Sequence, residues 1–148
     1  MLCGRNARRV VFECMNLATG HRVFLVREKQ YAVDFQAFLW EVGRHYGGRH
    51  AVILLDGDSS HTAKASCTLA KRLKIRLLWL PTRSPELNPM ETLWGQAKDA
   101  ICANTQYTTI DKQAEAFIAH LRGWSNREAL RTSGVLSEHF WLKRAMSK

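Results

Sequence analysis

The chain has 148 residues, of which 46% are hydrophobic and 24% charged, the size and apolar content of one globular domain. These values exclude a wholly disordered chain, because a protein of this length buries roughly two-thirds of its unfolded surface. Lys and Arg number 22 against 13 Asp and Glu, so the net charge of +9 favours polyanionic partners, nucleic acid above all.

The cysteines do not form a recognisable metal or disulfide motif. No two have C-x-x-C spacing and none lies with histidines at zinc spacing; they are Cys3, Cys14, Cys67 and Cys102. We therefore expect free thiols in a reducing compartment. No apolar run has transmembrane length and no signal peptide is expected, so the predicted location is the cytoplasm, with no membrane partner.

The first third of the chain predicts a β-hairpin followed by a helix. Residues 8–15 and 21–27 have strand character, and turn residues separate them at 16–20. Asp34 is the expected N-cap of the helix that follows, and two glycines end it at residues 47–48. The apolar residues of that helix recur at i, i+3, i+4 and i+7: Phe35, Phe38, Leu39 and Val42.

The middle of the chain alternates strand and helix. Residues 51–55 and 75–80 are apolar runs typical of parallel strands buried on both faces, and a helix is expected between them at about 62–74. The order hairpin, helix, strand, helix, strand, helix predicts an α/β fold. The basic run at 71–76 is interpreted either as the solvated end of a helix or as a phosphate contact.

All three prolines lie in residues 81–89, which excludes a helix interior or a central strand there. Asn88 and Pro89 form an N-cap and first-position pair, so a helix is expected from residue 89 to about 103. Further helices are expected at about 110–124 and 136–146. The chain is predicted to be a single domain over 1–148, with a helical extension from about residue 105.

Two carboxylates occupy positions that suit chemistry. Asp56 follows a buried strand, where open α/β sheets place ligands and catalytic groups; a structural role in capping the next turn is the alternative. Glu91 lies in the first turn of the helix after the proline-rich loop, where it would also complement the helix dipole. The two can converge at one sheet edge, and oxygen ligands there suit Mg²⁺ or Mn²⁺. Such metals activate water and stabilise the leaving oxygen in phosphodiester cleavage.

The surrounding motifs are more specific than the carboxylates alone. LLDGDSSH begins at Leu54, and LPTRSPELNPMETLWGQAK begins at Leu80, with 34 residues between Asp56 and Glu91. This pattern resembles the catalytic core of DDE transposases, and within them the bacterial insertion-sequence branch of the mariner-like superfamily. Gly57 stands where that family usually has Asn. The resemblance extends over roughly residues 4–125.

The resemblance implies an RNase H-like mixed sheet flanked by helices, and metal-dependent cleavage and joining of DNA strands at transposon ends. Asp56 and Glu91 would be catalytic metal ligands, in a site that holds two Mg²⁺ or Mn²⁺ ions. His61 matches the motif's histidine and would position a ligand or contact substrate; a histidine bonded to its own loop is the alternative. Asn88 would orient the Glu91 helix. Asp58 matches no motif carboxylate and is interpreted as a loop residue. Tryptophans are expected in the core: Trp40, Trp79 and Trp94.

The family also needs a first Asp, which ends a strand placed between the hairpin and the strand that ends in Asp56. No early acidic residue matches it, and the helix-turn-helix region that binds transposon ends is absent too. We therefore expect a truncated, nucleoid-associated remnant without nuclease activity of its own. Either the hairpin pairs directly with the 51–55 strand, or an open edge remains.

Two functions stay open. One is the catalytic part of a transposase, with DNA as its partner and with a second copy or a complementing N-terminal fragment. The other is a basic module that binds DNA or protein without catalysis. Whether the chain is an enzyme depends on completion of the carboxylate triad.

Overall fold

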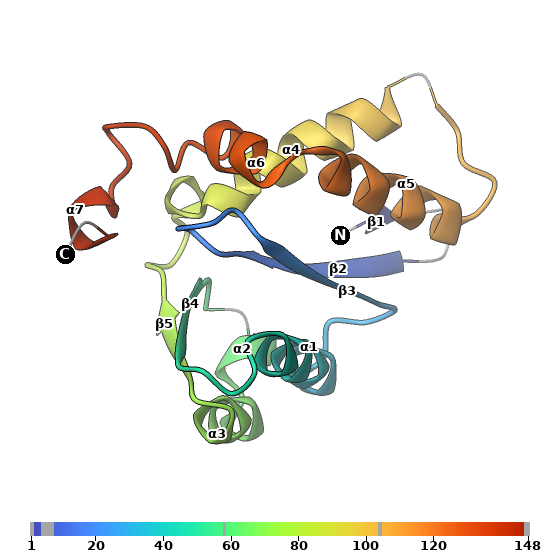
Figure 1. Ribbon diagram of the computed structural model, residues 1–148. Coiled ribbons are helices and arrows are strands. Elements are labelled where there is room, and N and C mark those ends of the chain that lie inside the picture. Colours follow the sequence, from blue (N-terminus) through green and yellow to red (C-terminus); the bar gives the residue numbers. More distant parts are fainter. Residues whose placement is uncertain (1, 4–7, 58, 104, 147–148) are drawn as a thin grey trace.

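The computed structural model describes residues 2–3, 8–57, 59–103 and 105–146. The strands are β1 (Leu2–Cys3), β2 (Arg8–Met15), β3 (Arg22–Arg27), β4 (Ala51–Leu55) and β5 (Ile75–Trp79). The helices are α1 (Ala32–His45), α2 (Ser59–Thr62), α3 (Lys64–Arg72), α4 (Pro89–Cys102), α5 (Ile110–Gly123), α6 (Asn126–Thr132) and α7 (Lys143–Met146), with a 3-10 turn at Pro85–Leu87. The β2–β3 hairpin lies between two groups of helices, with α1, α2 and α3 on one side, together with β4 and β5, and α4, α5 and α6 on the other (Figure 1).

The predicted hairpin is confirmed as β2 and β3. They pair antiparallel from Val10 with Arg27 to Met15 with Arg22. The side chain of Asn16 accepts hydrogen bonds from the backbone N–H groups of Ala18 and Thr19, at 2.9 and 3.2 Å, and these bonds stabilise the turn. Gly20 closes it with a φ of +78°, where a Cβ would lie 2.1 Å from the backbone oxygen of Asn126. Glycine is therefore required there by both conformation and space.

β2 is buried on both faces and separates two apolar clusters. On one face Val10 and Phe12 pack with α1, whose buried stripe is the predicted one of Phe35, Phe38, Leu39 and Val42. On the other face Met15 packs with α4 and α5, where the fully buried side chains are Leu93 and Leu121. A strand with core on both sides explains why apolar residues follow one another on both faces of β2 at Val10, Val11 and Phe12.

β4 and β5 pair in parallel, as expected, from Ala51 with Ile75 to Leu55 with Trp79. Their burial on both faces was wrongly predicted: Val52 is 60% exposed and Trp79 43%. Each of these strands has one strand neighbour among the described residues, so the pair covers fewer of its side chains than the middle of a larger sheet would.

Trp40 was also wrongly predicted to be in the core, because 54% of it is exposed. The inner stripe of α1 already fills the contact with β2, and Trp40 falls outside it. Its ring instead borders a shallow hollow beside α3.

The structure leaves β2 and β4 in separate sheets. β1, β2 and β3 form one, and β4 and β5 form the other. The predicted alternative of direct pairing between the hairpin and β4 is therefore not seen among the described residues, and the other alternative, an open strand edge, holds. This gap in the strand order positions the candidate site.

Helix α4 begins as predicted: Asn88 is its N-cap and accepts from the Met90 N–H at 3.0 Å, and Pro89 follows. Asp34 is not the N-cap of α1. It lies at the third position of that helix, accepts from the Tyr31 N–H at 2.9 Å and pairs with Arg27 at 2.8 Å. Asp34 does cap the helix start, but from the third helical position, where its carboxylate reaches back to the N-cap residue Tyr31; the helix therefore begins before Asp34 and not after it.

Other helix boundaries differ from the prediction. The helix expected at about 62–74 is α3, which is shorter, and an unpredicted short helix, α2, precedes it; the backbone of Ala63 between them is not helical. The helix expected at 136–146 is reduced to α7. The unpredicted α6 starts at a capping box in which Ser125 and Glu128 exchange hydrogen bonds. No helix in the described ranges is long and apolar enough to span a membrane.

Candidate functional site

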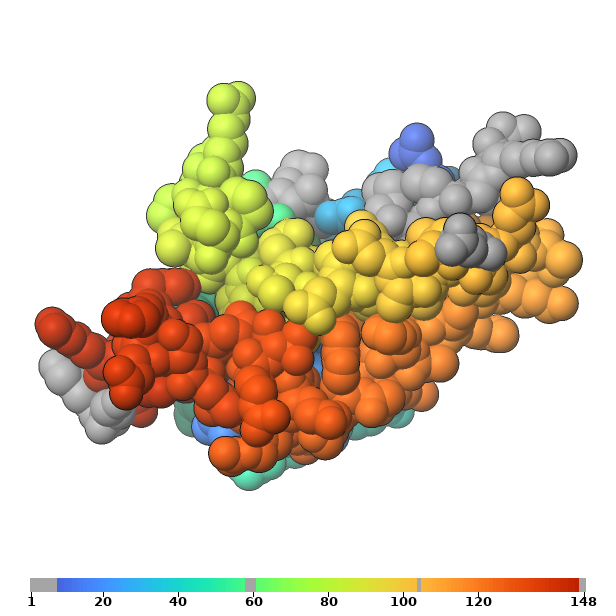
Figure 2. All heavy atoms as spheres, turned by 90° about the horizontal axis from the view of Figure 1, so that it is seen from above, coloured from blue at the N-terminus to red at the C-terminus, as the bar shows by residue number. Residues whose placement is uncertain are grey.

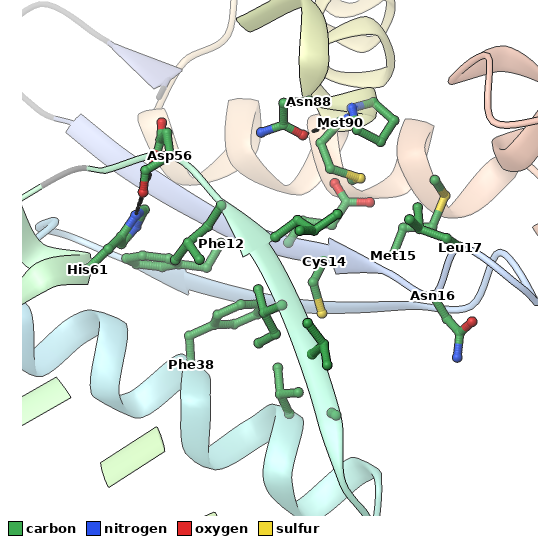
Figure 3. A pocket seen from close by; sticks show the side chains of 18 of the residues that line it. Phe12, Cys14, Met15, Asn16, Leu17, Phe38, Asp56, His61, Asn88 and Met90 are labelled. Carbon is green, nitrogen blue, oxygen red and sulfur yellow. Dashed lines mark hydrogen bonds and ion pairs between the residues drawn. The ribbon is translucent and has the colours of Figure 1, made fainter. Parts of the chain in front are cut away.

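A cavity of about 820 Å³ lies between β2 and β4 (Figure 3). Both strands line it along their length, α1 contributes Phe35, Phe38 and Val42, and the start of α4 contributes Met90. The cavity is therefore the gap left where the two sheets do not meet.

Asp56 lies at the mouth of this cavity, directly after β4, and 67% of its side chain is exposed. His61 turns back onto it: Nδ1 lies 3.0 Å from both the backbone oxygen and Oδ1 of Asp56 (Figure 3). The His61 ring also packs on Phe35, with 4.4 Å between ring centroids. The structure thus shows the loop-bonded arrangement of His61, which fixes one side of Asp56; contact with substrate stays a prediction.

The start of α4 borders the same cavity. Asn88 and Met90 line it, whereas the next residue, Glu91, is exposed and does not. The role of Asn88 in orienting the Glu91 helix is consistent with its cap hydrogen bond. The segment that joins β5 to α4 stands out from the surface (yellow-green in Figure 2).

The fold therefore brings Asp56, His61 and Asn88 to one cavity, with Glu91 one residue beyond its lining. Within the described ranges, His, Cys, Asp and Glu nowhere gather in groups of three or more that could hold a metal ion. Asp58 lies outside the described residues. The assignment of Asp56 and Glu91 as metal ligands stays a prediction.

Glu13 is a cavity residue that the sequence analysis did not single out. It is 7% exposed, and its Oε2 accepts a hydrogen bond from Trp94 Nε1 at 2.8 Å. Oε1 is buried and has no hydrogen-bond partner. Burial raises the pKa of Glu13 to about 7, although the Trp94 bond and the charge of Arg22 both oppose the rise. The available signal was an acidic residue between the apolar residues Phe12 and Cys14 of a strand.

Trp94 itself is half-buried against the cluster between α4 and α5, so its predicted place in the core holds for its ring. Its N–H end faces Glu13, which gives α4 a polar link to β2 across 81 residues of sequence. The free thiols that the structure describes are Cys14, Cys67 and Cys102.

Comparison with known proteins decides the family. The family model for the DDE superfamily endonuclease matches residues 3–113. This chain belongs to that family. A solved structure of the Mos1 transposase catalytic domain, with Raltegravir and Mg, matches with a TM-score of 0.67 and 18% identity, over 93% of this chain and 75% of that one. The predicted RNase H-like α/β fold is therefore confirmed.

A transposase relative supports a mariner-like DDE transposase, and an uncharacterized protein is also similar to this chain. The Tc3 transposase of Caenorhabditis elegans is 37% identical over 90 residues, which are 57% of this chain and 27% of that protein. The uncharacterized protein y4pE/y4sA of Sinorhizobium fredii (strain NBRC 101917 / NGR234) is 38% identical over 77 residues, 51% of this chain and 55% of that protein. The DDE chain thus spans about half of one relative and about a quarter of the other.

Proposed function

We propose that this DDE chain is the catalytic part of a bacterial insertion-sequence transposase, which cleaves DNA strands at transposon ends and joins them to target DNA in the cytoplasm. The observation that carries the proposal is the meeting of the Asp56 strand end and the α4 start at one cavity. Strand ends of open α/β sheets are where such folds place their reacting groups.

Asp56 and Glu91 would hold the divalent metal. Their oxygens suit Mg²⁺ or Mn²⁺ in type, and both side chains are exposed. When bound, the metal supplies an activated water and charge stabilisation for phosphodiester cleavage. The described residues offer no group of three ligands, so a third carboxylate has to complete the set. We propose that the chain alone does not cleave DNA.

The DNA contact is proposed from charge. The chain carries +9, and exposed basic side chains gather at the end of α3 and on β5: Lys71, Arg72, Lys74 and Arg76. Phosphate contacts of this kind need no particular base sequence. A second copy of the chain or a complementing fragment is the proposed protein partner.

Mn²⁺ binding to the purified chain tests the site, with electron paramagnetic resonance of the free ion as the readout. Asp56→Asn and Glu91→Gln should each weaken binding by roughly tenfold or more, because even outer partners of metal ligands contribute on that scale. Glu86→Gln, an exposed acid in the same segment, is the control and should bind as the unaltered chain does. Equal binding by all four chains would contradict the ligand assignment.

The same protein should not nick plasmid DNA in Mg²⁺ or Mn²⁺. Metal-dependent nicking that Glu91→Gln abolishes would show that the carboxylate set is already complete, and would overturn the proposal that the chain alone is inactive.

The alternative function is a basic module that binds DNA or protein without catalysis. The shortage of metal ligands among the described residues favours it. In that case DNA affinity should fall steeply between about 50 and 200 mM salt and should not change in Asp56→Asn, as measured by fluorescence anisotropy. Salt-independent binding would exclude the phosphate contact that both functions assume.

A further inference from the structure

An exposed tryptophan borders the hollow between α1 and α3, on the side of α1 that faces away from the cavity. Trp40 is 54% exposed and packs against neither apolar cluster, because α1 turns its buried stripe toward β2. α1 and α3 lie side by side below the hairpin in Figure 1. The hollow between them shares no lining residue with the cavity at Asp56, so it is a separate surface feature.

Packing between the two helices fixes the shape of this hollow. A Cβ at Gly43 of α1 would come within 3.2 Å of the side chain of Leu73, the C-cap residue of α3. Nearer the start of both helices, Gln36 Nε2 donates to Ser66 Oγ at 3.4 Å, and Ser66 is fully buried. The helices are therefore held together at two levels, and the hollow is formed before a ligand binds.

The charge of the hollow suits an anion. Among the described residues its lining contains two cations, Lys64 and Arg72, and no acid. Both cations are exposed, and neither has an ion-pair partner in the described ranges. The acid next to Trp40 in sequence, Glu41, is already paired with Arg44 at 2.7 Å. Lys64 and Arg72 are the first and last residues of α3, about 12 Å apart along its axis.

Trp40 supplies a flat apolar face between these cations. Trp94 and Trp141 donate hydrogen bonds within the fold, and Trp124 packs on His120. Trp40 has no such contact in the part of the chain that the structure describes. An aromatic face beside unpaired cations is the combination with which proteins hold an unpaired nucleic-acid strand, since bases stack on the ring and phosphates meet the cations.

We propose that this hollow binds an unpaired stretch of a DNA strand, with one base stacked on Trp40 and the neighbouring phosphates on Lys64 and Arg72. The inference rests on the proposed function only in taking DNA as the nucleic acid. Lys64 follows His61 by three residues, so their Cα atoms are at most about 11 Å apart. Because His61 bonds Asp56, a strand that lies at Asp56 can extend to the hollow.

Two other anions fit the hollow less well. An acidic peptide would use the cations but has no base to place on the Trp40 ring. Duplex DNA offers phosphates, but its bases are already stacked on one another inside the helix. Every base has a face that can stack, so the proposed contact is independent of base sequence.

Fluorescence anisotropy of a labelled thymidine oligonucleotide, about eight nucleotides long, tests the stacked base with the whole 148-residue chain. Trp40→Ala should weaken binding by about tenfold, and Trp40→Phe, which keeps an aromatic face, should recover most of the affinity. Neither variant removes a charge, so the slope of log affinity against log salt should not change. Val33→Ala, 62% exposed on the same helix, is the matched control and should bind as the unaltered chain does.

An oligonucleotide with the same phosphates but no bases separates stacking from charge without altering the protein. It should bind the unaltered chain about tenfold more weakly than the thymidine strand does. It should also bind Trp40→Ala and the unaltered chain equally. Equal affinity of the unaltered chain for the two oligonucleotides would overturn the stacked base.

The phosphate contacts are tested by the salt dependence. Lys64→Gln and Arg72→Gln should each make the slope shallower by about 0.7. Arg127→Gln, an exposed cation of α6 on the other side of the hairpin, is the control and should leave the slope unchanged. A slope that neither hollow variant changes, or competition by polyglutamate as strong as by the oligonucleotide, would overturn the proposal. Mn²⁺ binding at Asp56 and Glu91 is measured separately, so either proposal can fail alone.

Discussion

Glu13→Gln should make the chain more stable at pH 8 by about 3 kcal/mol, while leaving it nearly unchanged at pH 4.5. The carboxyl of Glu13 has its pKa raised from 4.5 to about 7 by burial, so the folded chain retains a proton that the unfolded chain has already lost. The stability contributed by the protonated group is fully present below pH 4.5 and is lost as the pH rises to about 7. Glutamine cannot ionise and therefore avoids this loss.

Urea unfolding of both proteins at pH 4.5, 6 and 8 measures the effect, and the difference between them cancels other titrating groups. Glu28→Gln is the control, because its exposed side chain should give the same stability difference at every pH. A Glu13→Gln difference that does not change between pH 4.5 and pH 8 would mean that Glu13 is not held protonated by burial.

Leu93→Ala should lower the free energy of unfolding by about 2–5 kcal/mol, since it removes a fully buried side chain and leaves a cavity. Leu93 lies in the cluster that joins α4 to α5 and the outer face of β2. It shares α4 with Glu91, two positions earlier, and with the Asn88 cap. Loss of this anchor should therefore also weaken Mn²⁺ binding, although Leu93 contacts no metal.

Chemical denaturation followed by tryptophan fluorescence gives the stability change. Thr92→Ala, on the exposed side of the same helix, is the matched control and should change stability by no more than about 0.5 kcal/mol. A loss below about 1 kcal/mol in Leu93→Ala would show that the α4 packing is looser than the structure indicates.

The sequence alone determined the features that depend on near neighbours. The β2–β3 hairpin followed from its turn residues and strand pattern, and the start of α4 followed from Asn88 and Pro89, because turns and caps are formed by residues a few positions apart. The family followed from two motifs that each occupy one continuous stretch. Helix ends without a strong local signal, such as the break at Ala63, were missed for the same reason.

Only the tertiary structure decided which segments meet. An apolar run such as residues 51–55 specifies a strand but not how many neighbours it has, so the exposure of Val52 and Trp79 could not be foreseen. The contact between Glu13 and Trp94 joins residues 81 positions apart in the sequence. The pKa of Glu13 is raised only because β2 is covered on both faces. The cavity between β2 and β4 is likewise a property of packing, because the two strands lie in separate sheets and their sequences do not specify that separation.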